Sequence, residues 1–290
     1  MSFKKLFLST LIVIIGLKQI HSQEFPIHVI EEGQIIVQVT LNDSISVNFI
    51  LDTGAGINVL SGKIYEKIKT TTYESGFITG FRHDGDRLDG KLYTIPSIAI
   101  GSQKVMNSET CVFPPLDAMG IDGLLSLKFF ENKLFAIDYA SNKLIFFNEN
   151  DFKETIKNKT KIPIELINHG DRILDMMIPI TLNENTKLYA LFDTGSGHNT
   201  IILHPYYLEK LKLKSEILNE SSYKKMISGE QKRQWITEIN TLKLTGSDKI
   251  VNQPTILFKE DLIYEGLIGS RLFADGKIFF DIENKTLYID

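Results

Sequence analysis

The sequence predicts an all-β protein made of two similar lobes. Segments rich in branched and aromatic residues, separated by Asn-, Asp- and Gly-containing turns, recur through most of the chain, as strands and hairpins do. They lack the regular strand–helix alternation of a parallel α/β fold. With 290 residues, 43% of them hydrophobic, the chain can bury a substantial core without disulfides.

The two lobes are predicted by an internal repeat. A segment beginning near Phe25 resembles one beginning near Ile162, and within them Asp52 aligns with Asp193, an offset of 193 − 52 = 141. A polar, Lys- and Asn-rich stretch separates the two copies and is expected to be a linker. The predicted organisation is a targeting segment (1–22), an N-terminal lobe (23–150), a linker (151–161) and a C-terminal lobe (162–290).

The N-terminal segment has the layout of a secretory signal peptide. Lys4 and Lys5 precede the apolar run Leu6–Leu17, and Ser22 offers a small residue for cleavage. The run is short for a membrane span, although an uncleaved anchor is the alternative interpretation. We therefore expect an exported protein, periplasmic or secreted, without a membrane span after cleavage.

Several classes of function are disfavoured by composition. The net charge of −4 lacks the basic excess of a nucleic-acid-binding protein. Cys111 is the one cysteine, so no internal disulfide can form, and no Cys/His cluster has the spacing of a zinc site. The acidic turn Asp84–Asp89 lacks the full spacing of a calcium loop. We expect neither a metal nor an organic cofactor.

Each half contains two apolar residues followed by Asp-Thr-Gly, a small residue and Gly. These motifs are Ile50–Gly56 and Leu191–Gly197. The apolar pair predicts a buried strand before each aspartate, and the glycines allow the two loops to approach closely. Hydroxyl groups of the threonines can hydrogen-bond across the contact. The residues expected to support the catalytic loops are Thr53, Gly54, Thr194, Gly195 and Ser196.

This arrangement would bring the carboxyl groups of Asp52 and Asp193 together. Two adjacent carboxylates cannot both ionise cheaply, so they share a proton. The charged group can then take a proton from a water molecule while the neutral group hydrogen-bonds a carbonyl oxygen. The paired motifs therefore predict hydrolysis of peptide bonds.

At these residues the sequence resembles the retropepsin-like aspartic proteases, in their bacterial single-chain, duplicated form. The resemblance includes a later signature of two apolar residues and Gly, present as Leu267–Gly269, whereas the first half has Leu124–Ser126 with Ser in place of Gly. We expect this serine to affect local packing but not the proton chemistry. The resemblance implies a barrel-like lobe from each half, a cleft that holds an extended peptide, and a monomer that contains both aspartates.

The resemblance also places a flap hairpin in each half, at 78–95 and 224–239. An extended substrate can add to such hairpins as a further strand; plain surface hairpins are the alternative. Trp235 either lines the cleft or sits in the core. The residues considered for flap movement or substrate binding are Gly80, Gly85, Gly229 and Trp235.

The two loops differ after Asp-Thr-Gly, and this difference predicts an asymmetric pair of aspartates. Ser196 has a hydroxyl that Ala55 lacks. A hydrogen bond from Ser196 to the carboxylate of Asp193 would lower its pKa. We therefore expect Asp193 to be the ionised member and Asp52 the protonated one. A nucleophilic pairing of Ser196 with His198 is disfavoured.

Two other functions fit the same sequence. One is a non-catalytic exported module that binds peptides in a retained aspartic-protease fold. The other is a structural β-rich envelope protein in which both Asp-Thr-Gly loops are only turns. The leading prediction remains an aspartic endopeptidase.

Overall fold

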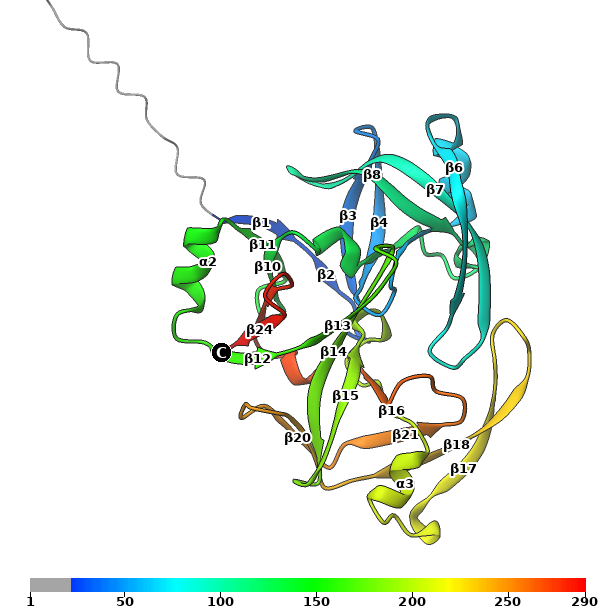
Figure 1. Ribbon diagram of the computed structural model, residues 1–290, viewed down its shortest axis with the longest axis vertical. Coiled ribbons are helices and arrows are strands. Elements are labelled where there is room, and N and C mark those ends of the chain that lie inside the picture. The colour runs from blue at the N-terminus through cyan, green and yellow to red at the C-terminus, as the bar shows by residue number, and fades with distance from the viewer. Residues whose placement is uncertain (1–21) are drawn as a thin grey trace, which may run out of the picture.

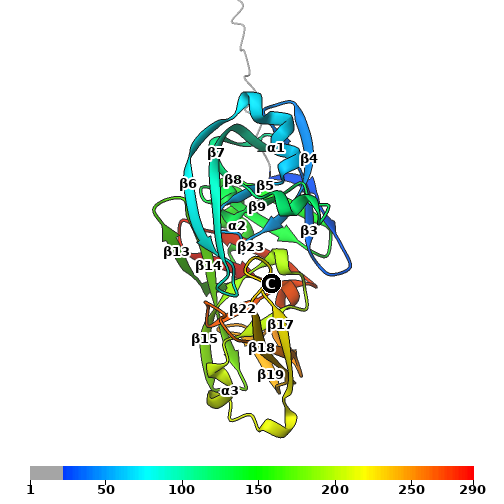
Figure 2. The same cartoon turned by 90° about the vertical axis from the view of Figure 1, so that its right-hand side faces the viewer.

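The computed structural model describes residues 22–290 and shows two β-rich lobes on a shared central sheet. The upper lobe in Figure 1 comes from the first half of the chain and the lower lobe from the second half. Figure 2 shows the lobes stacked along the long axis of the molecule. The predicted all-β, two-lobed fold is confirmed. The targeting segment predicted for 1–22 lies outside the described residues, Ser22 excepted.

The N-terminal lobe is an eight-stranded sheet. Its strands, in sheet order, are β2 (His28–Val29), β3 (Ile35–Leu41), β4 (Ile45–Asp52), β9 (Gly123–Ser126), β5 (Asn58–Leu60), β8 (Gln103–Val112), β7 (Arg87–Ile100) and β6 (Tyr73–Phe81). Burial alternates along β3, as expected for a strand with one face on the core. An additional β3–β7 pairing curls the sheet back on itself.

The C-terminal lobe is a ten-stranded sheet. Its strands, in sheet order, are β17 (Asn219–Lys224), β18 (Gln231–Glu238), β21 (Thr255–Lys259), β16 (Ile201–Leu203), β22 (Gly266–Ile268), β15 (Thr186–Phe192), β14 (Ile173–Leu182), β19 (Thr241–Leu244) and β20 (Ile250–Asn252), with β13 (Glu165–His169) paired to β14.

Both halves contribute strands to the central six-stranded sheet. Its order is β1 (Gln23–Pro26), β11 (Lys143–Phe147), β10 (Leu134–Asp138), β23 (Lys277–Asp281), β24 (Thr286–Ile289) and β12 (Thr160–Pro163). The two halves meet where β10 pairs with β23 in antiparallel register. The segment 151–161, treated above as a linker, contains most of helix α2 and the beginning of β12.

Helices are short and lie outside the sheets. The α-helices are α1 (Gly62–Ile68), α2 (Glu149–Ile156) and α3 (Tyr206–Lys210), and 3-10 turns occupy Lys69–Thr71, Pro114–Asp117, Leu127–Phe130, Thr194–Ser196, Ser215–Ile217 and Ser270–Phe273. The Asn148 side chain caps α2 by accepting the N–H of Asp151. No helix within residues 22–290 is long and apolar enough to cross a membrane.

The two halves use the same strand pairing around each Asp-Thr-Gly loop. Strand β4 runs parallel to β9, and β15 runs parallel to β22 in the same way. Strands β5 and β16 pair antiparallel to β9 and β22, respectively. Each loop is therefore held between two buried strands of its own lobe.

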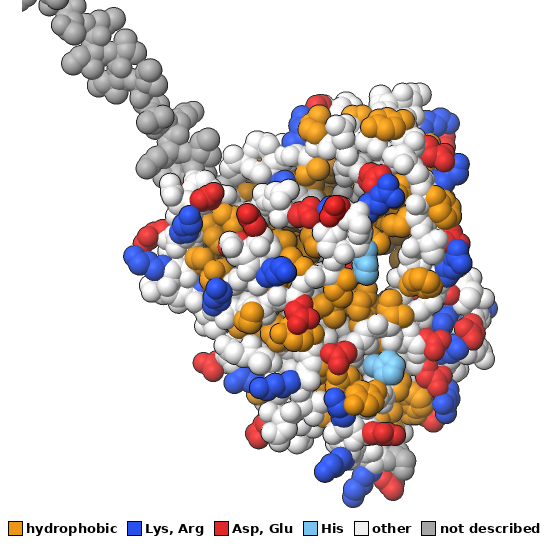
Figure 3. Space-filling view, viewed as in Figure 1, with side chains coloured by type: hydrophobic (Ala, Val, Ile, Leu, Met, Phe, Trp, Pro, Cys, Tyr) orange, Lys and Arg blue, Asp and Glu red, His pale blue; other side chains and the backbone are white. Residues whose placement is uncertain are grey.

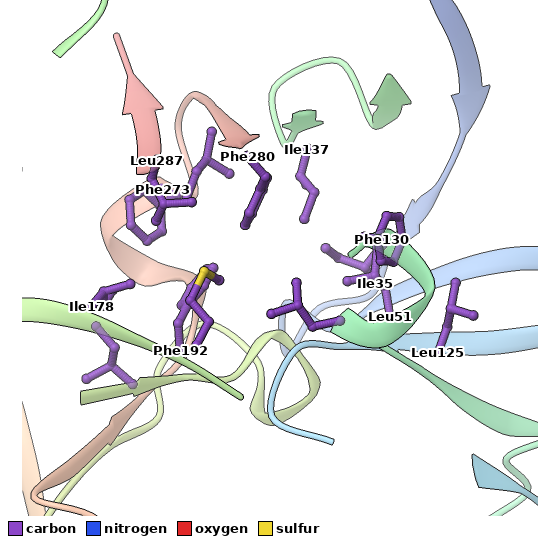
Figure 4. Packing of buried hydrophobic residues seen from close by; sticks show 14 of the residues in the cluster. Ile35, Leu51, Leu125, Phe130, Ile137, Ile178, Phe192, Phe273, Phe280 and Leu287 are labelled. Atoms are coloured by element: carbon purple, nitrogen blue, oxygen red, sulfur yellow. The ribbon is translucent and has the colours of Figure 1, made fainter. Parts of the chain in front are cut away.

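One continuous hydrophobic core connects the lobes with the central sheet (Figure 4). Phe135 on β10 stacks on Phe280 on β23, with ring centroids 4.3 Å apart. Phe130 packs on Phe135 from the N-terminal lobe, and Phe192 packs on Phe273 in the C-terminal lobe. Because these rings link both halves, the lobes are expected to unfold together.

Ser126 stands where the family pattern has glycine, and its buried polar groups all form hydrogen bonds. Its side chain is fully buried, and its hydroxyl donates to the Asn58 side-chain oxygen over 3.1 Å. The N–H of Ser126 donates to the same oxygen over 2.8 Å. Gly269, its counterpart, has no such room, because a Cβ atom there would overlap the carbonyl oxygen of Gly197.

This difference predicts that substitution by alanine is tolerated at position 126 but not at the equivalent position 269. Gly269→Ala should lower the free energy of unfolding by about 3 kcal/mol or more, because backbone must move to admit the methyl group. Ser126→Ala should cost only about 1–2 kcal/mol, because its hydroxyl makes two hydrogen bonds, one donated to Asn58 and one accepted from the N–H of Lys128. Urea unfolding of both variants measures the difference, and equal costs would contradict it.

Candidate active site

The two aspartates lie at matching ends of buried strands. Asp52 is the last residue of β4, and Asp193 directly follows β15. The N–H of Asp193 donates to the carbonyl oxygen of Ile268 over 2.9 Å, which ties the loop to the neighbouring strand β22. The apolar residues before each aspartate therefore anchor the loop, as the motif predicts.

Two threonines join the loops by reciprocal hydrogen bonds. The Thr53 hydroxyl donates to the carbonyl oxygen of Phe192 over 2.5 Å, and the Thr194 hydroxyl donates to that of Leu51 over 2.7 Å. Each hydroxyl oxygen also accepts the other threonine's N–H over 3.1 Å. Both side chains are fully buried, so these bonds form away from competing water.

Glycine at the third motif position allows the carboxyl groups to approach. A Cβ atom on Gly54 would lie 2.5 Å from the Asp193 carboxyl carbon, and one on Gly195 would overlap that of Asp52. Each aspartate therefore lies directly over the glycine of the opposite loop. The two carboxyl groups share a hydrogen bond, so the structure brings Asp52 and Asp193 together.

Burial is the main cause that raises the pKa of both aspartates. The pKa of Asp193 is raised well above its usual range by burial and then by the adjacent Asp52. The pKa of Asp52 is raised by burial, but the hydrogen bond from Asp193, backbone N–H groups and the charge of Arg82 oppose that rise. The pair thus holds one proton, with Asp193 as its main carrier.

The expected asymmetry of the pair was therefore wrong. The Ser196 hydroxyl donates to the main-chain carbonyl oxygen of Asp193 over 2.9 Å, and the carboxylate does not receive this bond. The Ser196 N–H donates to Asp193 Oδ1, but Asp52 Oδ1 receives matching N–H groups from its own loop. With the two sets of backbone bonds balanced, the positive charge of Arg82 favours ionisation of Asp52.

Two hairpins extend over the aspartates, one from each lobe. Strands β6 and β7 form one, with its tip at 82–86, and β17 and β18 form the other, with its tip at 225–230. They converge tip to tip at the right of Figure 1. A hollow, here called the cleft, opens between the hairpins and the body of the molecule (Figure 3).

Asp86 joins the hairpin tips across the cleft. Its side chain is 3% exposed, and its carboxylate accepts the N–H of Ile227 over 2.5 Å and that of Ser228 over 3.1 Å. Burial opposes the charge of Asp86, but the hydrogen bonds from Ser228 and Ile227 outweigh it and lower the pKa. The carbonyl oxygen of His83 accepts the N–H of Ile263, a second bond to the C-terminal lobe.

The predicted flap residues have different surroundings. Gly85 and Gly229 lie at the two tips with positive φ, at 73° and 71°, where glycine is the favoured residue. Gly80 lies within β6 with open space around it. Trp235 packs against the main core, and its ring N–H donates to Glu220 over 3.0 Å. Trp235 therefore packs against the core from outside and is only partly buried, so the placement inside the core was wrong.

The remaining sequence candidates do not form a second site. His198 hydrogen-bonds Ser270 and not Ser196, so the disfavoured Ser–His pairing is not formed. Cys111 is buried, and burial raises its pKa to about 11. Within residues 22–290, no group of three or more His, Cys, Asp or Glu side chains is placed to hold a metal ion.

Four residues near the aspartates were missed by sequence reasoning. Gln34 and Asp175 precede their catalytic loops by the same distance in each half, so the repeat alignment contained this signal (175 − 34 = 141). Tyr264 and Arg82 come from a loop and a hairpin tip and carry no motif. Arg82 has a buried Nε atom without a hydrogen-bond partner in the described part of the chain.

Comparisons with known proteins agree on the fold. A sequence model described as aspartyl protease matches residues 37–129, less than half of the chain. Basic 7S globulin from soybean superposes with a TM-score of 0.54 at 9% identity, covering 93% of this chain and 94% of that chain. A structure of edgp superposes with a TM-score of 0.55 at 10% identity and the same coverage. Such low identities establish the shared fold alone. No curated protein sequence gives a significant match.

The raised pKa of the pair predicts how stability depends on pH. An acid whose pKa is raised by folding binds its proton more tightly in the native state, so stability falls as pH rises from the usual 3.8 to the raised value. The Asp193→Asn variant has no carboxyl group to lose this proton. Its free energy of unfolding should therefore rise relative to that of the wild type between pH 4 and 7, by up to about 1.4 kcal/mol per pH unit.

Urea unfolding at several pH values measures this difference. Asp171→Asn, at an exposed turn, is the charge-matched control and should follow the wild-type curve. Parallel curves for the wild type and Asp193→Asn would contradict the shared-proton assignment.

The bonds to Asp86 predict a local change in hydrogen exchange. Asp86→Ala removes the acceptor for two backbone N–H groups, so the amides of Ile227 and Ser228 should exchange at least about tenfold faster. Asp89→Ala, which alters an exposed ion pair with Arg87 in the same hairpin, should leave them unchanged. Equal exchange in both variants would show that Asp86 does not hold the tips together.

Proposed function

We propose that this aspartic protease-like protein is an endopeptidase that hydrolyses peptide bonds with water activated between Asp52 and Asp193. The observation that carries the proposal is the contact of these two carboxyl groups, each over the glycine of the opposite loop. A loop that served only as a structural turn would not require two carboxyl groups to lie in contact and share one proton. Their raised pKa values also represent a cost in stability, which is typical of a functional site.

In the proposed reaction, the two aspartates have different roles. Ionised Asp52 accepts a proton from a water molecule, whose oxygen forms a bond to the carbonyl carbon of the peptide. Protonated Asp193 hydrogen-bonds the carbonyl oxygen and stabilises the charge that develops on it. Transfer of the Asp193 proton to that oxygen completes a tetrahedral diol. The diol breaks down when Asp52 gives the proton it took from water to the amide nitrogen, Asp193 takes a proton back from a diol hydroxyl, and the carbon–nitrogen bond breaks. The residues then return to their starting shared-proton state.

The hairpins support a peptide as the substrate. Both hairpins extend from sheets, their tips are joined, and the charge of Arg82 at the first tip acts on Asp52. An extended chain between the hairpins and the aspartates can therefore form main-chain hydrogen bonds with strand-like geometry. The bonds from Asp86 to the opposite tip must break before an intact polypeptide can enter from the side. Reclosure would exclude bulk water and hold the substrate over the aspartates.

We further propose that the enzyme works outside the cytoplasm as a monomer. The N-terminal sequence resembles a signal peptide, which supports export to the periplasm or secretion. A single chain supplies both aspartates and both hairpins, so a second copy is not needed to complete the site.

Digestion of a peptide library between pH 3 and 8 tests the activity. Asp52→Asn and Asp193→Asn should each lower kcat/KM by about a thousandfold or more, because neither variant retains a complete acid–base pair. A statine-type inhibitor should block the wild type. Asp89→Asn, at an exposed site outside the pair, should retain full activity.

Two outcomes would overturn the proposal. Cleavage that survives both Asn substitutions would place the activity elsewhere. Peptide binding by the wild type without cleavage over the whole pH range would identify a peptide-binding module with the same fold.

A further inference from the structure

The two sides of the cleft carry different charges at equivalent positions. Gln34 and Asp175 are related by the same 141-residue offset as the catalytic aspartates, so each lies 18 residues before the aspartate of its own half (52 − 34 and 193 − 175). The Gln34 side chain donates to the Gly195 carbonyl oxygen over 2.5 Å, so its amide is occupied by the catalytic loop. Asp175 places a carboxyl group at the corresponding place on the other side.

Asp175 is enclosed but incompletely paired. Its side chain is 6% exposed, and Oδ2 accepts a long hydrogen bond of 3.4 Å from the Tyr264 hydroxyl. Its other oxygen, Oδ1, faces the catalytic loop, 3.0 Å from where a Cβ atom on Gly56 would lie. No hydrogen bond from residues 22–290 reaches Oδ1. An unpaired carboxylate in such a place is costly without a cation.

Asp175 is also close to the reacting groups. Its carboxyl group interacts electrostatically with Asp52, and Tyr264 interacts with both Asp175 and Asp193. The carboxyl of Asp175 is thus within reach of a substrate residue next to the bond being cleaved. The remaining charged neighbour is His169 on β13.

An aromatic ring lies beside Asp175. Tyr264, whose hydroxyl reaches Asp175, is partly exposed, and behind it lies a cluster of side chains that the lobe itself buries: Met177, Leu191, Ile202, Leu262 and Leu267. The methylene stem of a lysine or arginine can pack on the Tyr264 ring while its charged end reaches the carboxylate. The low local dielectric strengthens this attraction relative to that in water.

We propose that Asp175 is a specificity-determining residue that selects peptides with a lysine or arginine near the scissile bond, on the C-terminal-lobe side of the cleft. This inference rests on the proposed peptidase function. On the opposite side, the neutral and occupied Gln34 provides no such selection. The enzyme is therefore expected to prefer a basic residue on only one side of the cleaved bond.

The test compares two N-acetylated peptides that differ only in lysine or norleucine at the position preferred in the library digest. At pH 7 the wild type should cleave the lysine peptide with at least about tenfold higher kcat/KM. Asp175→Asn, which retains the shape of the side chain, should abolish this ratio mainly through KM while still cleaving the norleucine peptide. Asp171→Asn, which removes one exposed charge from the adjacent turn, should keep the ratio.

The ratio also has an expected pH dependence. Burial raises the pKa of Asp175 to about 6, and its titrating or charged neighbours are Tyr264, His169 and Asp52. The carboxyl group is neutral below this pH, so the preference for lysine should grow as pH rises from 5 to 7. Titration of the catalytic pair affects both peptides and cancels in their ratio.

The outcomes separate this inference from the proposed function. Cleavage without a lysine preference, or a preference that Asp175→Asn leaves intact, would overturn the role of Asp175 alone. If no peptide is cleaved, fluorescence anisotropy of the two peptides bound to Asp193→Asn still tests selection by Asp175. Equal affinities there would overturn the inference, and tighter binding of the lysine peptide would support it.

Discussion

The reciprocal hydrogen bonds between Thr53 and Thr194 are the constraint on which the site depends. Each hydroxyl donates to a carbonyl oxygen of the other lobe and accepts an N–H from the opposite loop. These four bonds cross the junction of the lobes in a fully buried setting, where an unmade bond would be costly. They hold two loops together whose aspartates would otherwise repel each other, and thereby make a shared proton the stable state.

The rest of the fold supports this junction from both sides. On one side of it, strands β10 and β23 and the stacked rings of Phe135 and Phe280 join the halves into one core. On the other side, Asp86 connects the hairpin tips through backbone N–H groups. The contact at the central sheet is apolar and extensive, whereas the contact at the hairpin tips consists of a few hydrogen bonds. Opening is therefore expected at the hairpins and not at the core.

The near-symmetry of the molecule makes its differences informative. Equivalent backbone bonds surround the two aspartates, so the difference between their pKa values arises first from the hydrogen bond they share, which favours ionised Asp52, and then from the charge of Arg82 on the same side. Equivalent positions beside the loops hold Gln34 and Asp175, one occupied by the fold and the other available to a ligand. A duplicated scaffold thus provides a common catalytic geometry, while single substitutions make its two sides chemically distinct.

Much of this protein was determined by local sequence alone. Strand periodicity, the repeat and the paired Asp-Thr-Gly motifs predicted two β lobes with their aspartates in contact, because such patterns dictate burial and backbone geometry over a few residues. Tertiary structure alone decided the direction of the Ser196 hydroxyl, the packing of Trp235 against the outside of the core and the approach of Arg82 and Asp86. They depend on which side chains meet across distant segments, and neither motif nor periodicity encodes those distances.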